Sequence, residues 1–355
     1  MQLSLILSAF TVLPFSWFLP LNLLPAKLPP NEPTIVKVAV DAQFDKQLEI
    51  SEGMAAVRIN DKWGFVNKDG LVKINKSFDE VRSFSGGLAA VRVGEQWGFV
   101  NKRGKFTIKP QFDDALSFHD KRTFVKQYGI WGLVSKKNKI IARPQFETVG
   151  VFSEGFASVS VNGKYGFVNK KGKTIGDLTY LDAKDFSNGL AAVKTGSKRW
   201  GFVDKKSEMV IPATFEAVDK FSLHGCAVKW EGKWGIIDKN GTIKVANNYD
   251  RLSAMAYGFF MVEKNGKLGL IDNNGEEVTG IKYDEIASFS EGMLRVKIDD
   301  KIGFLNSFGQ EEIPLIYDQS TDFTDGKAKV SLDGRVGFVT KNGDSLFEKK
   351  AISKR

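Results

Sequence analysis

Cysteine and histidine are nearly absent from this 355-residue chain, which holds one cysteine, Cys226, and two histidines, His119 and His224. A single cysteine cannot form an intrachain disulfide, and its small-apolar repeat position predicts a buried thiol. No second histidine or cysteine stands at metal-ligand spacing, so the sequence does not support a zinc site. Both histidines fall near turns, and we interpret them as turn residues rather than as a base or a metal ligand.

Sequence motifs for nucleophilic or nucleotide chemistry are also missing. The chain has no Gly-x-Ser-x-Gly elbow, no P-loop and no dinucleotide fingerprint. Its 51 basic and 42 acidic residues give a net charge of +9, but the two signs are interspersed. This pattern indicates a solvated surface and ranks nucleic-acid binding last.

The N-terminal segment lacks charge. Residues 1–26 carry no charged side chain and are rich in Leu, Ile and Phe, which predicts a signal peptide or a membrane anchor. Because this segment has neither a basic start nor a clear small-x-small cleavage site, cleavage stays open. Residues 27–43 are expected to form a linker, residues 44–350 the folded part, and residues 351–355 a basic tail.

The tetrapeptide Trp-Gly-Phe-Val, or a variant of it, returns about every 34 residues along the folded part. The last three copies keep the glycine but replace the tryptophan with Leu268, Ile302 and Val336. A fixed period over nine copies indicates a repeat architecture and argues against an enzyme, which needs different residues in one place. We predict no catalytic, cofactor-binding or metal-binding residue. The expected structural anchors of the repeat are Trp63, Gly64, Trp97, Gly98, Trp131, Gly132, Tyr165, Gly166, Trp200, Gly201, Trp234, Gly235, Gly269, Gly303 and Gly337.

Each repeat opens on an aromatic residue that is usually followed by an acid. This mark divides the folded part into nine units: 44–77, 78–111, 112–145, 146–179, 180–214, 215–248, 249–282, 283–316 and 317–350.

Three short strands are predicted in the unit 78–111: Leu88 to Val93, Trp97 to Val100 and Lys105 to Ile108. A very short fourth strand or turn is expected at Phe78 to Val81. Glycine-bearing turns separate the strands, and the second turn ends on Gly104, where a positive φ is needed.

Several repeat positions carry further expectations. Asn138 replaces the turn glycine and should adopt its left-handed conformation, whereas Ser207 should change the turn. The glycine after each tryptophan should lie under an aromatic ring from an adjacent strand or repeat. Prolines are expected to end the third strand in some units, at Pro110, Pro144, Pro212 and Pro314.

The repeats resemble the WG-repeat family, also written KWG. Residues 152–159 match its Phe-Ser-x-Gly-Leu-Ala-x-Val element, and residues 162–172 match its Gly-Lys-Trp-Gly-Phe-Ile/Val-Asp/Asn-Lys-x-Gly element nearly throughout. The resemblance covers about residues 44–350. It implies a repeat that mediates interactions, is often exported and has no assigned chemistry.

The expected fold is all-β, with tandem 34-residue β-meander repeats stacked as an open curved solenoid. A closed propeller-like ring is the alternative, because three-stranded units must also stack to bury both faces. The 34-residue period also fits tetratricopeptide repeats, but the short apolar blocks and frequent glycines exclude those helices.

Two columns of polar residues recur at fixed repeat positions. The acids that follow the opening aromatic could pair for glycoside hydrolysis, but their repetition favours hydrogen bonds to a backbone turn in every unit. Asp or Asn at the second turn could bind calcium, but a turn role is favoured there too. The first column is Asp79, Asp113, Glu147, Glu216, Asp250, Asp284 and Asp318, and the second is Asn67, Asn101, Asn169, Asn306, Asp204, Asp238 and Asp272.

Two surfaces remain as candidates for binding. The tryptophan column could stack on sugars, although burial between repeats is favoured. A lysine edge at the second turn could contact anionic partners, although a solvated turn is favoured. It consists of Lys102, Arg103, Lys136, Lys137, Lys170, Lys171, Lys205 and Lys206.

The sequence therefore predicts a non-enzymatic repeat scaffold that binds a protein partner at the cell envelope or outside the cell. A carbohydrate-binding or cell-wall-binding array is the first alternative, and a glycan-directed enzyme the second. No cofactor is expected, and membrane contact is expected only through residues 1–26.

Overall fold

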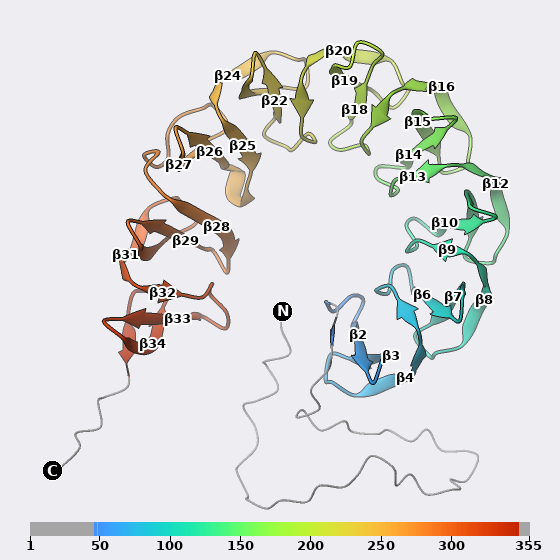
Figure 1. The fold of residues 1–355 in the computed structure, drawn as a ribbon, viewed down its shortest axis with the longest axis horizontal. Coiled ribbons are helices and arrows are strands. Elements are labelled where there is room, and N and C mark those ends of the chain that lie inside the picture. The colour runs from blue at the N-terminus through green and yellow to red at the C-terminus, as the bar shows by residue number, and fades with distance from the viewer. Residues whose placement is uncertain (1–45, 48, 348–355) are drawn as a thin grey trace, which may run out of the picture. The chain divides into compact units, whose positions relative to one another are not determined.

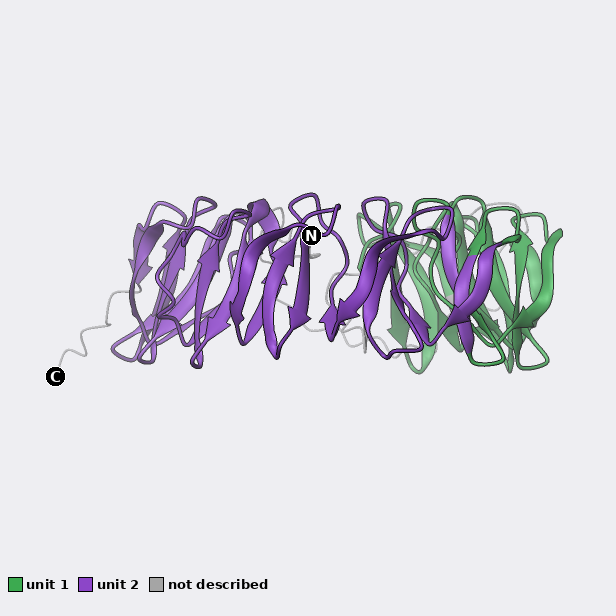
Figure 2. Cartoon of the chain, turned by 90° about the horizontal axis from the view of Figure 1, so that it is seen from above, with its two compact units in different colours: residues 1–155, 159–163, 168–174 green, residues 156–158, 164–167, 175–355 purple. Residues whose placement is uncertain are grey.

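The computed structural model describes residues 46–47 and 49–347. The segments expected to be a signal peptide or anchor (1–26), a linker (27–43) and a basic tail (351–355) lie outside the described residues. The chain divides into two units, shown in different colours in Figure 2. Unit 1 comprises residues 1–155, 159–163 and 168–174, and unit 2 comprises residues 156–158, 164–167 and 175–355.

Nine antiparallel sheets, one for each sequence repeat, make up the described part of the chain (Figure 1). In each sheet the strands are neighbours in the order in which they follow along the chain. Eight sheets have four strands and the seventh has three. The described residues form no α-helix and only one 3₁₀ turn, η2 (Ala256–Gly258).

The first three sheets belong to unit 1, and the fourth holds residues of both units. Their strands are β1 (Lys46–Gln47), β2 (Met54–Ile59), β3 (Lys62–Asn67) and β4 (Val72–Phe78); β5 (Glu80–Val81), β6 (Leu88–Val93), β7 (Gln96–Asn101) and β8 (Phe106–Phe112); β9 (Asp114–Ala115), β10 (Arg122–Gln127), β11 (Ile130–Ser135) and β12 (Ile140–Phe146); and β13 (Thr148–Val149), β14 (Phe156–Val161), β15 (Lys164–Asn169) and β16 (Thr174–Tyr180).

The last five sheets belong to unit 2. Their strands are β17 (Asp182–Ala183), β18 (Ala191–Lys194), β19 (Trp200–Val203) and β20 (Met209–Phe215); β21 (Ala217–Val218), β22 (Cys226–Trp230), β23 (Lys233–Ile237) and β24 (Ile243–Tyr249); β25 (Arg251–Ala254), β26 (Phe260–Lys264) and β27 (Lys267–Ile271); β28 (Glu285–Ser290), β29 (Met293–Ile298), β30 (Lys301–Leu305) and β31 (Glu311–Tyr317); and β32 (Gln319–Ser320), β33 (Lys327–Leu332), β34 (Arg335–Thr340) and β35 (Ser345–Phe347).

The predicted third strand is longer than the sequence indicated. In the second sheet it continues from Phe106 to Phe112 as β8, and Pro110 lies inside it rather than at its end. Pro144, Pro212 and Pro314 likewise lie inside β12, β20 and β31, so the expectation that prolines end this strand is wrong. The pairing shifts between Trp97↔Phe112 and Phe99↔Ile108, which leaves a bulge on an edge strand. Proline is tolerated in such a bulge because no ladder hydrogen bond is required there.

This bulge also explains the glycine that follows each tryptophan. A Cβ atom on Gly98 would lie 2.7 Å from the carbonyl oxygen of Ile108 and 2.7 Å from the nitrogen of Pro110. The backbone of the bulged strand, not an aromatic ring, therefore excludes a side chain, and our expectation for this glycine is corrected. Among the described repeats an aromatic side chain also approaches at two of these positions, Gly235 and Gly337.

The sheets of unit 1 pack face to face. Trp97 and Phe99 on one face of the second sheet share a core with Phe118 and Val125 of the third. The opposite face of the second sheet, with Val91 and Val100, packs against Trp63 and Phe65 of the first sheet.

Burial on both faces leaves all four residues Trp97 to Val100 buried. Each buried aliphatic or phenyl side chain contributes about 1.5–3 kcal/mol to folding.

The all-β expectation is confirmed, since each described repeat is a β-meander. No described sheet closes on itself. The very short fourth strand is also confirmed: it is β5, which opens the second sheet. Asn138 adopts a φ of 59° as expected. Ser207 does not change its turn, because it has a φ of 69° and donates to the carbonyl of Asp204 as Gly104 does to that of Asn101.

Candidate functional site

The tryptophan column contributes to the core more than to the surface. Trp63, Trp97 and Trp200 are buried, while Trp131 and Trp234 are half-buried. The guanidinium of Arg82 lies over the ring of Trp97 at 5.1 Å. The favoured interpretation, burial between repeats, is confirmed for the three buried rings.

The first acid column ties neighbouring sheets together. The Asp79 carboxylate accepts a hydrogen bond from the backbone N–H of Gly94 at 2.7 Å and another from Lys62 in the preceding sheet. The other acids accept from the equivalent turn, as in Asp284 with the N–H of Asp299 at 2.9 Å. The turn role is therefore confirmed. The hydrogen bonds from Lys62 and from Lys267 hold the pKa values of Asp79 and Asp284 below their ordinary value.

The second column builds the turn after each tryptophan strand. The side-chain oxygen of Asn101 accepts from the N–H groups of Arg103 at 2.9 Å and Lys105 at 3.1 Å. Asp238 does the same with Asn240 and Thr242, and these backbone bonds, the one from Thr242 first, lower its pKa. The turn interpretation is confirmed. The described residues contain no group of three or more His, Cys, Asp or Glu placed to hold a metal ion.

The serine of the Phe-Ser-x-Gly loop also has a structural role. The hydroxyl of Ser51 donates to the carbonyl of Phe84 in the next loop at 2.7 Å, and Ser187 and Ser290 repeat this bond with Phe221 and Phe323.

Part of the lysine edge is used inside the fold. Lys102 Nζ lies 3.3 Å from the carboxylate of Glu52, the tip residue of the preceding loop, and donates to its carbonyl at 2.6 Å. We call such a pair a rung: it joins a loop tip to the first turn residue of the next sheet, 50 residues later. The rungs of unit 1 are Glu52–Lys102, Gly86–Lys136 and Asp120–Lys170, and Glu291–Lys341 is a rung of unit 2.

Two consecutive rung positions in unit 2 lack charge. Leu223 and Tyr257 stand at the loop tips, and the residues 50 positions later are Asn273 and Ser307 instead of lysine. Leu223 is 83% exposed and Tyr257 57% exposed. Phe308, the residue after Ser307, is 73% exposed.

These three side chains lie at one end of the sheets. The Phe-Ser-x-Gly loop precedes the second strand and the Asn-Lys-x-Gly turn follows the third, so an antiparallel meander places both at the same end. The rungs show that a loop tip and the turn of the next sheet adjoin there. We call Leu223, Tyr257 and Phe308 the loop-end strip.

Residues of neighbouring loops contact the strip and the residue next to it. The Tyr257 ring meets Phe289 edge to face with 4.8 Å between centroids, and its hydroxyl lies 3.7 Å from where a Cβ on Gly292 would stand. The His224 imidazole lies 3.3 Å from the equivalent point on Gly258 in η2, the short turn beside β25 in Figure 1. These contacts join the loops of the sixth, seventh and eighth sheets.

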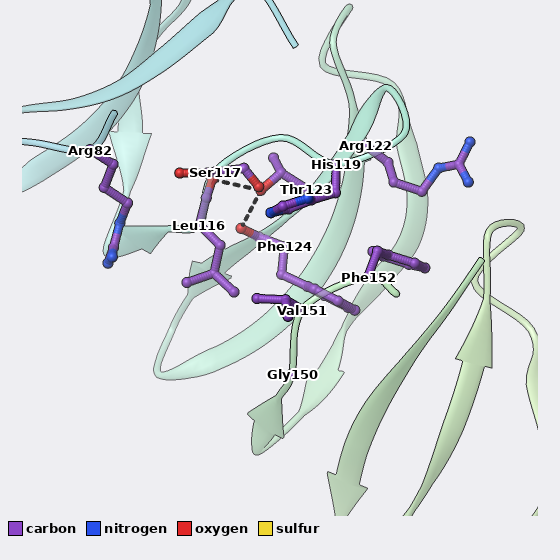
Figure 3. A pocket seen from close by; sticks show the side chains of 10 residues that line it. All are labelled: Arg82, Leu116, Ser117, His119, Arg122, Thr123, Phe124, Gly150, Val151 and Phe152. Atoms are coloured by element: carbon purple, nitrogen blue, oxygen red, sulfur yellow. Dashed lines mark hydrogen bonds between the residues drawn. The ribbon is translucent and has the colours of Figure 1, made fainter. Parts of the chain in front are cut away.

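A cleft of about 190 Å³ lies between loops of unit 1 (Figure 3). It is lined by Leu116, Phe124, Val151 and other residues, with the His119 ring beside the Thr123 hydroxyl. That hydroxyl is occupied, because it donates to the carbonyl of Leu116 at 2.7 Å. The cleft forms where Leu116 and Gly150 replace the long cations that Arg82 and Lys184 supply at this repeat position.

The histidines and the cysteine are not brought together. His119 is an exposed loop residue of unit 1 and His224 an exposed loop residue of unit 2. The Cys226 thiol is buried, as expected, and burial raises its pKa.

The loop-end strip was missed by sequence reasoning. The sequence does contain a regular spacing of 50 residues between loop-tip acids and lysines. Because this spacing is longer than one repeat, only the contacts in the structure show that the two positions are paired.

Comparison with known proteins supports the repeat assignment. The model of the WG containing repeat matches residues 37–63, 63–97, 97–129, 131–165, 165–198, 200–228, 234–267, 269–301 and 302–335. A search of curated proteins found no match. The described residues contain no helix long and apolar enough to cross a membrane.

Among solved structures, one similarity reaches a TM-score of 0.50 and the others reported are weaker. A crystal structure of the eukaryotic initiation factor is similar with a TM-score of 0.50 and 12% identity, over 82% of this chain and 94% of that one. BamB from Moraxella catarrhalis has a TM-score of 0.37 and 11% identity, over 88% and 99% of the two chains. PorZ of Porphyromonas gingivalis, a bacterial surface component of the type-IX secretion system, has a TM-score of 0.31 and 9% identity, over 87% and 52%.

Proposed function

The chain belongs to the WG containing repeat family, and from this premise we propose that it is a non-enzymatic scaffold that binds a protein partner. The observation that carries the proposal is a difference between residues that follow the repeat and residues that depart from it. Repeated polar side chains bond to neighbouring repeats, as Asp79 does to Gly94 and Lys62. Residues that break the repeat, such as Leu223 and Phe308, are exposed.

Exposed apolar side chains that interrupt a charged pattern are typical of interaction surfaces. The stacked sheets supply a rigid support, since both faces of their central strands are buried. Repeat scaffolds of this kind present extended surfaces to partners.

We place this scaffold at the cell envelope or outside the cell. The support is the N-terminal stretch of 26 residues without a charged side chain, which fits an export signal or an anchor.

The experiment is a capture assay with the full chain immobilised and exposed to envelope and secreted extracts, read by mass spectrometry after washes of increasing salt. The same chain, heat-denatured, is the control for adhesion to unfolded segments. A defined protein that binds the native chain alone and survives moderate salt supports the scaffold. Recovery of polysaccharide in place of a protein would contradict the protein-binding scaffold and favour a carbohydrate-binding or cell-wall-binding array.

A further inference from the structure

We propose that the loop-end strip of Leu223, Tyr257 and Phe308 is the docking surface for an uncharged, apolar segment of a polypeptide partner. The inference rests on the proposed function and specifies its site and its chemistry.

The first argument is the coordinated loss of charge on both sides of two rungs. At Leu223 and Tyr257 the tip is apolar, and at Asn273 and Ser307 the lysine is missing as well. Loss of the acid alone would leave a lysine without its partner beside an apolar tip. Replacement of both members removes charge from this stretch, as expected where a partner must displace water from apolar side chains.

The second argument is the contrast between the turns of the seventh and eighth sheets and the doubly basic turns that precede them. The doubly basic turn pairs are Lys102-Arg103, Lys136-Lys137, Lys170-Lys171 and Lys205-Lys206. The pairs Asn273-Asn274 and Ser307-Phe308 of unit 2 carry no charge. An acidic or polyanionic ligand would be attracted to the former pairs and not to the latter, so the strip fits a neutral partner.

The third argument is the backbone of Tyr257, which has φ 61° and ψ 17°. The loop tip is also left-handed in other repeats, for example at Glu52 and Glu291, both with a φ of 51°. What is unusual at Tyr257 is the residue type, because a bulky aromatic residue tolerates this region less well than Asn, Asp or Gly. Its ring is nevertheless held upright against Phe289 while more than half of the residue stays exposed. A fixed, partly exposed aromatic side chain is a typical anchor of protein interfaces, because little side-chain entropy is lost on binding.

The fourth argument separates a polypeptide from a sugar. Sugars stack on aromatic faces, and a protruding aliphatic side chain offers no such face. Leu223, the most exposed residue of the strip at 83%, is aliphatic and suits contact with the apolar side chains of a polypeptide segment.

The test restores the missing rungs. In one variant Leu223→Glu is combined with Asn273→Lys, and in another Tyr257→Glu is combined with Ser307→Lys. Both introduce the residue types of the Glu52–Lys102 pair. Thermal melting followed by circular dichroism checks that each variant folds, because Tyr257→Glu also removes the ring contact with Phe289. The matched control is Tyr128→Ser, because Tyr128 is a 94% exposed tyrosine with positive φ in a turn of unit 1.

The probe is a phage-displayed library of random 12-residue peptides selected on the full chain at high salt. We expect selected peptides to be rich in Leu, Phe and Trp and poor in charged residues. Each rung-restored variant should bind them at least tenfold more weakly, and Tyr128→Ser should bind them as the parent does.

Equal binding by the restored variants, or no selected binder, overturns the inference. If the native chain still captures a defined protein in the extract assay, the scaffold function survives that result. Saturable binding of neutral oligosaccharides that is lost in both restored variants would overturn the inference and the proposed function together.

Discussion

At the scale of single residues, the glycine after each tryptophan shows how one missing side chain permits the repeat. The bulged strand β8 crosses this position so closely that a Cβ on Gly98 would sit 2.7 Å from the carbonyl oxygen of Ile108 and 2.7 Å from the nitrogen of Pro110. Backbone atoms cannot rotate away as a flexible side chain can. The sequence identified the position, but the partner could not be predicted because the bulge depends on strand register.

Gly98→Val is therefore expected to destabilise the protein by more than about 2 kcal/mol through overpacking. Chemical denaturation followed by far-ultraviolet circular dichroism measures the loss. Gly196→Val is the matched control, because a Cβ there meets nothing within 4 Å and the backbone φ is ordinary. A change in the control as large as that in Gly98→Val would show that close backbone approach is not the cause.

The acid column gives a prediction on pH at the same scale. The pKa of Asp284 lies below its ordinary value of 3.8 chiefly because Lys267 donates a hydrogen bond to it at 2.5 Å. A carboxyl group whose pKa is lowered by folding stabilises the fold above its ordinary pKa. That contribution is lost as the pH falls through the lower, folded value.

Lys267→Met should raise the pKa of Asp284 toward 3.8 and reduce the contribution of this carboxylate to acid stability. Carbon-13 NMR titration of the side-chain carboxyl groups measures the pKa of Asp284 in the parent and in the variant. Asp238 is the internal control, because backbone N–H groups, that of Thr242 first, lower its pKa. An unchanged titration of Asp284 in Lys267→Met would contradict the assignment of its pKa to this lysine.

At the scale of elements, turns and short strands were predictable because their determinants are local. The spacing from Asn101 to Gly104 specifies a turn in which the asparagine side chain and a left-handed residue both take part. The strand β8 was predicted too short because proline was assumed to end it, whereas the edge position and bulge make Pro110 harmless. The rungs were not predictable, because they join positions 50 residues apart across two repeats.

The turn at Ser207 allows a stability test of this local logic. Ser207 adopts a φ of 69° where most repeats have glycine. Left-handed conformation costs an L-residue about 1–2 kcal/mol, and the extra freedom of glycine in the unfolded chain offsets about 0.4–1 kcal/mol. Ser207→Gly should thus raise the free energy of unfolding by roughly 0.5–1 kcal/mol.

Denaturant titration measures this gain, with Gly343→Ser as the reverse substitution. Gly343 has a φ of 85° and only one heavy atom, at 3.8 Å, near the position of an added Cβ, so strain rather than crowding should dominate. A loss of stability in Ser207→Gly would mean that the serine hydroxyl makes a contribution larger than its strain.

At the scale of the whole molecule, adjacent sheets within each unit share their core, as the first and second sheets do. In unit 2 the eighth sheet buries Phe304 against Phe323 and Val330 of the ninth. The ninth sheet carries Phe338 at the same repeat position, but no later sheet follows among the described residues, and Phe338 is 47% exposed. Lys327 and Lys329, exposed on the same face, replace the apolar residues found in the second sheet at Leu88 and Ala90. A polar outer face is typical of a terminal repeat that ends a stack.

The same substitution at these two equivalent positions should therefore have different consequences. Phe304 is 1% exposed, so Phe304→Ala should lower the free energy of unfolding by about 3–5 kcal/mol, as expected when a phenyl group is removed from a core. Phe338→Ala should stay within about 1 kcal/mol of the parent, because most of its surface already faces water. Equilibrium unfolding of both variants in one denaturant series gives the comparison. Equal losses would mean that the outer face of the ninth sheet is covered in solution, and that the terminal repeat is not a cap.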